Sequence, residues 1–81
     1  MKVIVKLFAG ARELAGAEEV SVELTAGATV GQLREQLIAN YAQLRPLVGH
    51  AMFAIGAVYC DDSVEVSEQA EIACIPPVSG G

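Results

Sequence analysis

The residues best suited to chemistry are the last two, Gly80 and Gly81, which follow the segment Pro76-Pro77-Val78-Ser79. Two glycines at the final two positions are expected by chance in only about 0.5% of chains. A terminal Gly-Gly presents a carboxylate with no side chain beside it, on backbone that can pass through a narrow channel. Small residues also collect in tails without a role, but the pair indicates a chain end used as a chemical group.

Other reactive side chains are few and do not combine into a site. Cys60 and Cys74 are the only cysteines, too few for a disulfide framework or a four-ligand metal site, so we expect both to be reduced. His50 has no cysteine or carboxylate at ligand spacing and is expected to be a surface or loop residue. With no glycine-rich phosphate loop and no nucleophile paired with a base, we expect no metal, no bound cofactor and no independent enzyme site.

The composition indicates one small acidic domain. The 81 residues are 53% hydrophobic, and 10 acidic against 5 basic residues give a net charge of -5 without a Lys/Arg cluster. Nucleic acid is therefore not an expected partner. The apolar N-terminal run is interrupted by Lys6 and nothing approaches membrane-spanning length, so we expect a cytoplasmic protein with no membrane partner.

The elements that must position the tail begin with two strands. Residues 2–8 alternate so that Val3, Val5 and Leu7 face a core while Phe8 points outward. Residues 10–16, bounded by glycines, are expected to form a loop with a short helical turn. Residues 19–24 alternate again, and we expect this strand to pair with the first one as in a hairpin.

The rest of the chain predicts one main helix and further strands. Thr29 and Gln32 have the spacing of a capping box, and apolar residues then recur at helical spacing from Val30 to Tyr41. An irregular connection with a turn of helix is expected over 44–49, strands over 52–55, 58–60 and 71–75, and a turn at Gly56. Val64 and Val66 are expected to pack beneath a polar loop. The pattern predicts an α+β fold, a mixed sheet of four to five strands with one main helix.

Two segments resemble a known family, namely Leu7–Gly16, with the sequence LFAGARELAG, and Ile75–Gly81, with the sequence IPPVSGG. The chain resembles the small sulfur-carrier subunits of molybdopterin synthases, which are ubiquitin-like β-grasp proteins, over essentially its whole length. The resemblance implies a β-grasp domain over 1–75 and an extended tail over 76–81. The chain departs from the family pattern at two turns. Residues Glu68–Glu71 lack the glycine that the family often has before its last strand, and Ile55-Gly56 stands where the family tends to have Asn-Gly.

The resemblance implies a role for the Gly81 carboxylate. It would be adenylated by a ubiquitin-activating-like adenylyltransferase that uses ATP, and then converted to a thiocarboxylate, 1-thioglycine, with sulfur from a donor protein. That sulfur would attack a pterin precursor in a pocket of the large synthase subunit, within an assembly of two small and two large subunits. The tail residues Pro76, Pro77, Val78, Ser79 and Gly80 would insert into this partner, with a reach of about 20 Å.

Partner docking has its own sequence signal. In the last strand, Ile72 and Cys74 have core parity, which leaves Ala73 and Ile75 pointing outward, like Phe8 on the first strand. If the two strands are neighbours, as in the β-grasp fold, Phe8 and Ile75 form an exposed apolar patch near the root of the tail, extended by Tyr59. The resemblance adds Arg12 as a residue that pairs with acidic groups of a partner.

Three other functions are compatible with the same tail. One is a sulfur carrier for thiamine synthesis or another thiocarboxylate pathway, although Pro-Pro-Val-Ser before Gly-Gly favours the molybdopterin branch. The second is a ubiquitin-like modifier joined through Gly81 to substrate lysines. The third is a passive β-grasp interaction domain with a dispensable tail.

Overall fold

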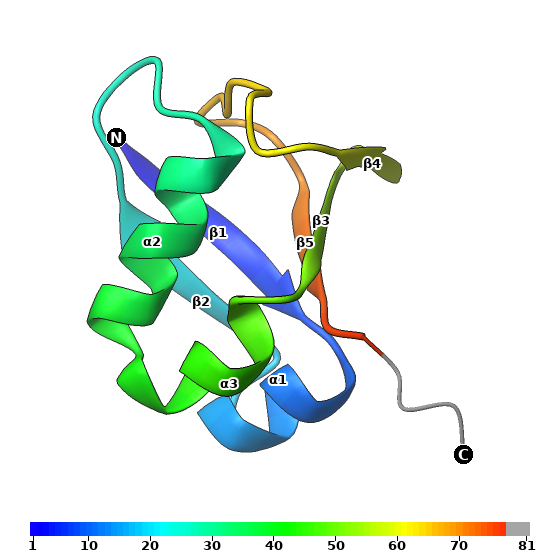
Figure 1. The fold of residues 1–81 in the computed structure, drawn as a ribbon. Coiled ribbons are helices and arrows are strands. Elements are labelled where there is room, and N and C mark those ends of the chain that lie inside the picture. Colours follow the sequence, from blue (N-terminus) through cyan, green and yellow to red (C-terminus); the bar gives the residue numbers. More distant parts are fainter. Residues whose placement is uncertain (78–81) are drawn as a thin grey trace.

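Five strands and the helices packed on them make up most of residues 1–77, the part of the chain that this computed structural model describes. The strands are β1 (Lys2–Leu7), β2 (Glu19–Glu23), β3 (Met52–Ile55), β4 (Val58–Cys60) and β5 (Ile72–Ile75). The helices are α1 (Ala9–Ala15), α2 (Val30–Asn40), the 3-10 helix η1 (Ala42–Leu44) and α3 (Arg45–Val48). Figure 1 shows α2 lying across the sheet, with α1 and α3 together near one end of it.

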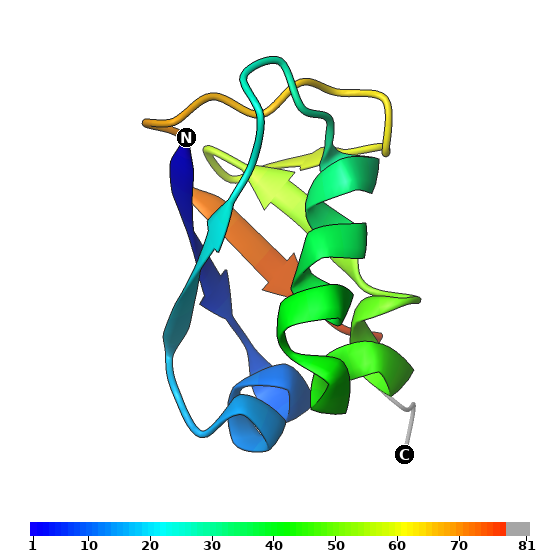
Figure 2. The ribbon, with the colours of Figure 1, turned by 90° about the vertical axis from the view of Figure 1, so that its left-hand side faces the viewer.

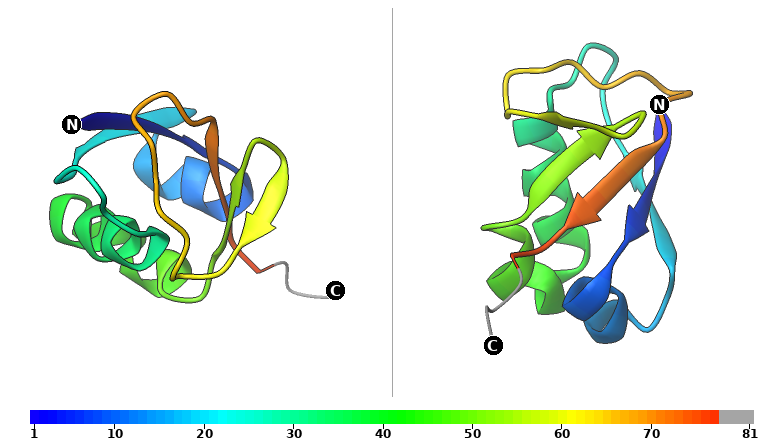
Figure 3. Two further views of the ribbon diagram at one scale, coloured as in Figure 1. Left: turned by 90° about the horizontal axis from the view of Figure 1, so that it is seen from above. Right: turned by 90° about the vertical axis from the view of Figure 1, so that its right-hand side faces the viewer.

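The strands form one mixed sheet in the order β2-β1-β5-β3-β4. β1 and β5 are parallel neighbours, whereas the other three pairs are antiparallel. Because β1 and β5 are parallel, they end at the same end of the sheet, beside α1 (Figure 3). This arrangement confirms the predicted α+β fold and places the last strand in the middle of the sheet.

Alternation along the strands separates a core face from an open face. The side chains of Val3, Val5 and Leu7 in β1 are buried, as are those of Ile72 and Cys74 in β5, which confirms the predicted parity. Figure 2 shows α2 against one face of the sheet, while the opposite face carries no helix of the described chain.

Helix α2 begins as its sequence predicts. The Gln32 N–H donates to Thr29 Oγ1 (3.3 Å) and the Thr29 N–H donates to Gln32 Oε1 (2.8 Å), which completes a capping box. Val30, Leu33 and Leu37 then point into the core and are fully buried. The apolar stripe of the helix thus covers the core face of the sheet.

Two segments hold more helix than the sequence predicts. Residues 9–15 form α1 and not a loop with a single turn; the helix ends at Gly16, whose φ of +69° allows its N–H to donate to the Arg12 carbonyl. β1 and β2 do pair as predicted, but α1 replaces a tight hairpin turn between them. Residues 42–48 form η1 and α3, where Pro46 is tolerated in the first turn because no helical N–H is required there.

In the loop after β4, two valines were predicted to be buried, but only one of them packs into the core. Val66 is buried and its N–H donates to the Ala28 carbonyl, which ties the loop to the start of α2. Val64 accepts a hydrogen bond from the Val30 N–H through its backbone carbonyl, and its side chain remains exposed. The backbone pairing with α2, which the sequence pattern does not reveal, decides which valine turns inward.

Candidate docking face and root of the tail

The tail leaves the sheet at the end of β5. The strand ends at Ile75 because Pro76 and Pro77 have no N–H group to continue the ladder. Pro76 is buried and Pro77 is exposed, so the chain leaves the folded domain between the two prolines. Val78, Ser79, Gly80 and Gly81, and with them the predicted reactive carboxylate, lie outside the described residues.

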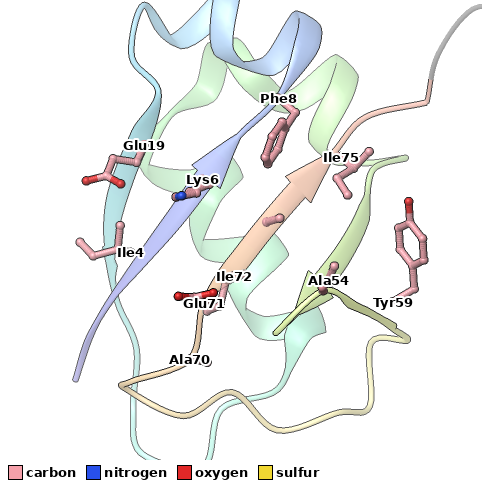
Figure 4. A pocket seen from close by; sticks show the side chains of 12 residues that line it. Ile4, Lys6, Phe8, Glu19, Ala54, Tyr59, Ala70, Glu71, Ile72 and Ile75 are labelled. Carbon is pink, nitrogen blue, oxygen red and sulfur yellow. The ribbon is translucent and has the colours of Figure 1, made fainter.

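The open face of the sheet carries the apolar side chains that the sequence placed outward. Phe8 is 44% exposed and Tyr59 is 60% exposed, while Ile75 is half-buried. The β1–β5 register pairs Leu7 with Cys74, so Phe8 and Ile75 follow on adjacent chains (Figure 4). The predicted patch therefore exists as a surface beside the root of the tail, and Ile4 extends it along β1.

This surface is hollowed and not flat. A depression of about 480 Å³ lies over the open face between β1 and β4. Ala54 and Ala73, paired across β3 and β5, supply only methyl groups at its floor. The larger side chains of Phe8, Tyr59 and Ile75 stand around them (Figure 4). We call this depression the alanine hollow; its full lining is Ile4, Lys6, Phe8, Glu19, Ala54, Ala57, Tyr59, Ala70, Glu71, Ile72, Ala73 and Ile75.

Three charged residues lie at the rim of the alanine hollow. Lys6 on β1 is directly opposite Glu19 on β2, at a position where opposite charges attract across strands. Glu71 is exposed just before β5, and none of the three side chains is in either of the ion pairs formed within residues 1–77. With Lys6 and Glu19 balancing each other, the rim carries a net negative charge.

Arg12, predicted as a partner contact, lies outside the alanine hollow. It is exposed on α1 and lines a smaller depression of about 200 Å³ together with Glu18. Lys6, Phe8 and Glu19 line both depressions, so Arg12 is adjacent to the apolar surface. The structure thus brings Phe8, Tyr59 and Ile75 to one surface and puts Arg12 at its border.

Arg34 holds the strand segment that carries Tyr59. One guanidinium nitrogen of Arg34 donates to the carbonyls of Val48 and Ala51, each at 2.7 Å, and the other donates to Asp62 Oδ1 at 2.8 Å. The guanidinium also lies over the Phe53 ring, 5.0 Å from its centroid. These contacts tie α2 to the segment before β3 and to the turn after β4. No sequence motif pointed to Arg34, since its three partners come from distant parts of the chain.

The two thiols have no arrangement for sulfur chemistry. Cys74 is fully buried, and burial raises the pKa of its thiol to about 11, against a smaller opposing effect of the Arg34 charge. The Cys60 thiol is half-buried and donates to the Val58 carbonyl. The cysteines pair with Phe53 from opposite sides and are two strands apart, about 10 Å, which is too far for a disulfide. Both are free, as predicted.

The described part of the chain has neither a metal-ligand cluster nor a helix that could span a membrane. Within residues 1–77, no group of three or more His, Cys, Asp or Glu side chains is placed to hold a metal ion. None of the helices formed by these residues has both the length and the apolar character required to cross a membrane.

Strand order decides which residues line the alanine hollow. Outward parity on the last strand already identified Ala73 as a residue of the open face. Ala54 and Ala57 were missed, because nothing in the sequence says that β3 lies beside β5. A small residue with outward parity on a central strand is the signal that could have suggested a depression.

The chain matches proteins with related names along its whole length. The model of the ThiS family matches residues 5–81. A Chlamydomonas reinhardtii protein named molybdopterin synthase sulfur carrier subunit is 36% identical over 83 residues, covering 100% of both chains. An Arabidopsis thaliana protein of the same name is 32% identical over 81 residues, covering 100% of this chain and 84% of the relative.

Solved structures confirm the β-grasp architecture. The crystal structure of small archaeal modifier protein 1 from Haloferax volcanii superposes with a TM-score of 0.86 at 28% identity and covers 100% of both chains. A complex of subunits 1 and 2 of the molybdopterin-converting factor from Helicobacter pylori contains a chain that matches with a TM-score of 0.69. At 21% identity over 100% of both chains, that likeness concerns the fold alone.

Proposed function

The chain belongs to the ThiS family, and on that premise we propose that it is a sulfur carrier for synthesis of the molybdenum cofactor, with Gly81 as the residue that bears the sulfur. The observation that carries this proposal is the match of the family model through residue 81, which includes the Gly-Gly end. The end-to-end similarity to the Chlamydomonas sulfur carrier subunit supports the choice of pathway.

The proposed chemistry begins with activation of a carboxylate. A carboxylate is a poor electrophile, so one oxygen of the Gly81 carboxylate must become part of a good leaving group. Attack of that oxygen on ATP, bound by an activating adenylyltransferase, forms an acyl adenylate and releases pyrophosphate. Sulfur supplied at the oxidation level of sulfide then attacks the acyl carbon, so that a C–S bond forms, the C–O bond to AMP breaks and AMP leaves. The product is a thiocarboxylate, which is ionised and nucleophilic at neutral pH. The need for ATP fits the expected cytoplasmic location.

The folded domain positions this chain end on its partners. The apolar side chains of Phe8, Ile75 and Tyr59 are exposed beside the place where the tail leaves the sheet, which is the arrangement of a docking surface. We propose that this surface binds the large synthase subunit, whose pocket receives the tail and performs the transfer to the pterin precursor. Pro76 and Pro77 restrict the first tail residues and so reduce the entropy lost on insertion.

The proposal is tested by the mass of the intact chain. After co-expression with the activating enzyme and a sulfur source, a fraction of the chain should gain the mass difference between sulfur and oxygen at its C-terminus. A variant that lacks Gly81 should not gain it, and its melting temperature should match that of the native chain. If the native chain never acquires sulfur under conditions in which the activating enzyme consumes ATP, the proposal is wrong.

A ubiquitin-like modifier is the second candidate function. The similarity to the Haloferax volcanii modifier protein, at a TM-score of 0.86, favours it specifically. In that case Gly81 would form an isopeptide bond with a lysine of another protein. Immunoblots of cell extracts would then show conjugates of higher mass that disappear when Gly81 is deleted, which a carrier alone does not produce.

A sulfur carrier for thiamine synthesis is a further alternative, and it would differ from the proposed function only in the molecule that accepts the sulfur. A deletion strain separates the two branches, because loss of a molybdenum-cofactor carrier abolishes molybdoenzyme activity and leaves growth without thiamine intact. The opposite phenotype would assign the chain to thiamine synthesis.

A further inference from the structure

The open face of the sheet has an unusual centre for a surface that docks proteins. Ala54 and Ala73 face each other across β3 and β5, and in the parallel register Ala73 also lies opposite Lys6. A methyl group extends one carbon from the backbone, whereas the side chains of Phe8 and Tyr59 extend much further. The face is therefore concave, with a hollow of about 480 Å³ at its centre.

We propose that the alanine hollow is a socket for one large apolar side chain, aromatic in view of the volume, that projects from the large synthase subunit. This inference rests on the proposed function, because the partner is the one named there. Pockets that receive an aromatic anchor contribute most of the binding energy in many protein interfaces. A flat partner surface would leave the hollow unfilled and would lose the contacts that its lining can make.

The position of the socket gives it a role in delivery of the tail. Ile75 lines the hollow and is followed directly by Pro76, which is buried. An anchor side chain seated over Ala73 would thus hold the partner within a few residues of the point where the tail leaves the domain. Two attachment points on one partner, the socket and the inserted tail, fix the direction in which the tail enters.

The charges at the rim specify what should surround the anchor. Lys6 and Glu19 lie opposite each other in the β1–β2 register, so their charges offset, whereas Glu71 has no basic residue opposite it in the sheet. The partner should therefore place a basic side chain next to its aromatic anchor, where it can meet Glu71. Replacing Glu71 with Gln should weaken binding by a few-fold at low salt and make binding less sensitive to added salt.

The central experiment fills the alanine hollow with a larger side chain at Ala73. Ala73→Leu adds apolar atoms inside the hollow, and Ala39→Leu, on the exposed side of α2, adds the same atoms on the opposite side of the molecule. Calorimetric titration of the large subunit should show binding weakened about 10- to 100-fold by Ala73→Leu, the range expected for overpacking, and unchanged by Ala39→Leu. If the docking surface were a flat apolar patch, Ala73→Leu would bind equally well or more tightly, and that result would overturn the inference.

A measurement on the native chain keeps the inference testable if Ala73→Leu fails to fold. With methyl-labelled alanine, the methyl groups of Ala54 and Ala73 should show nuclear Overhauser effects to aromatic protons of the bound large subunit. A complex that shows such effects at Phe8 but none at the two alanines contradicts the socket.

Two other results would distinguish failure of the proposed function from failure of the socket inference. If the native chain does not bind the large subunit at all, the proposed function fails and not merely the socket. If the native chain sediments as a dimer, Ala73→Leu sediments as a monomer and both bind the large subunit equally, the hollow is occupied by a second copy of the chain and the inference is wrong.

Discussion

At the scale of single residues, the surroundings of the two thiols make neither of them a candidate for sulfur transfer. The buried Cys74 side chain has a pKa of about 11 and is therefore protonated at neutral pH, which makes it a poor nucleophile. Cys60 donates to a backbone carbonyl within its own strand. Neither cysteine is placed to carry sulfur, so the chemistry proposed for this chain depends on Gly81.

The pKa of Cys74 predicts how stability changes in alkaline solution. The thiol titrates near 9.0 when unfolded and near 11 when folded, so between these values the unfolded chain loses a proton that the folded chain retains. The free energy of unfolding should fall as the pH rises through this window, by up to about 2 kcal/mol after a reduction for solvent screening, and should be unaffected below it. Urea denaturation at pH 8, 9.5 and 11 measures the change.

The control for this prediction is Cys74→Ala. The variant should be less stable at pH 8 because it leaves a cavity, but it should lose less stability than the native chain between pH 9 and 11. It should also still acquire sulfur at its C-terminus. Identical pH profiles for the two proteins would show that Cys74 does not cause the alkaline loss.

At the scale of elements, the position of β4 depends on Arg34. Its guanidinium donates to two backbone carbonyls before β3 and to Asp62 after β4, and its side chain is only 19% exposed. β4 is a short edge strand, paired only with β3 in the described sheet, so these contacts supply much of what holds it in place. Tyr59 is thereby fixed at one side of the alanine hollow.

Substitutions at Arg34 and Asp62 should lower the free energy of unfolding by different amounts. Arg34→Met leaves the carbonyls of Val48 and Ala51 without their donor and should lower the free energy of unfolding by about 2–4 kcal/mol. Asp62→Asn removes only the exposed part of the network and should cost less than about 1 kcal/mol. Chemical denaturation of both variants tests this order; equal costs would mean that the carbonyl contacts contribute little.

The β3–β4 turn contains a strained residue. Gly56 and Ala57 both have positive φ values, +56° and +67°, as in a type I′ hairpin turn. An alanine in this conformation is disfavoured by about 1 kcal/mol, whereas glycine adopts it freely. Ala57→Gly should therefore stabilise the fold by up to about 0.5 kcal/mol after the entropy of glycine in the unfolded chain is counted. The melting temperature measures the change, and Ala39→Gly, in the last turn of α2, should shift the melting temperature in the opposite direction.

At the scale of the whole molecule, the proposed function assigns docking and transfer to different parts of the chain. The described residues 1–77 form the core and the open face of the sheet, and the residue proposed to react, Gly81, follows them in the sequence. The parallel pairing of β1 with β5 joins the two parts, because it brings Phe8 to the same end of the sheet from which the tail leaves.

A chain truncated after Pro77 should separate these two activities. It should fold, bind the large subunit through the open face with reduced affinity, and donate no sulfur. Added in excess to the native chain, it should inhibit sulfur transfer competitively, as measured by formation of the sulfur-containing product. A truncated chain that fails to compete would indicate that the tail, and not the sheet, supplies the binding energy.

The sequence alone predicted most of the residues that face the core, and it indicated the chain end as the place of the proposed chemistry. Period-two alternation in β1 and β5 predicted the burial of Val3, Val5 and Cys74, because a strand directs successive side chains to opposite faces. The capping box at Thr29 predicted the start of α2. Strand alternation and the capping box depend on residues that are close in sequence, so the local sequence is sufficient to predict both.

Only the tertiary structure decided how distant segments combine. The alanine hollow requires Ala54 beside Ala73, and the Arg34 contacts join α2 to the segment before β3 and to the turn after β4. Val66 is buried where its N–H donates to the Ala28 carbonyl, just before α2. Such contacts join residues far apart in the chain, and a local pattern does not specify strand order or the partners of a long side chain. The sequence therefore predicted which residue reacts, whereas the shape of the surface beside the root of the tail emerged only from the folded sheet.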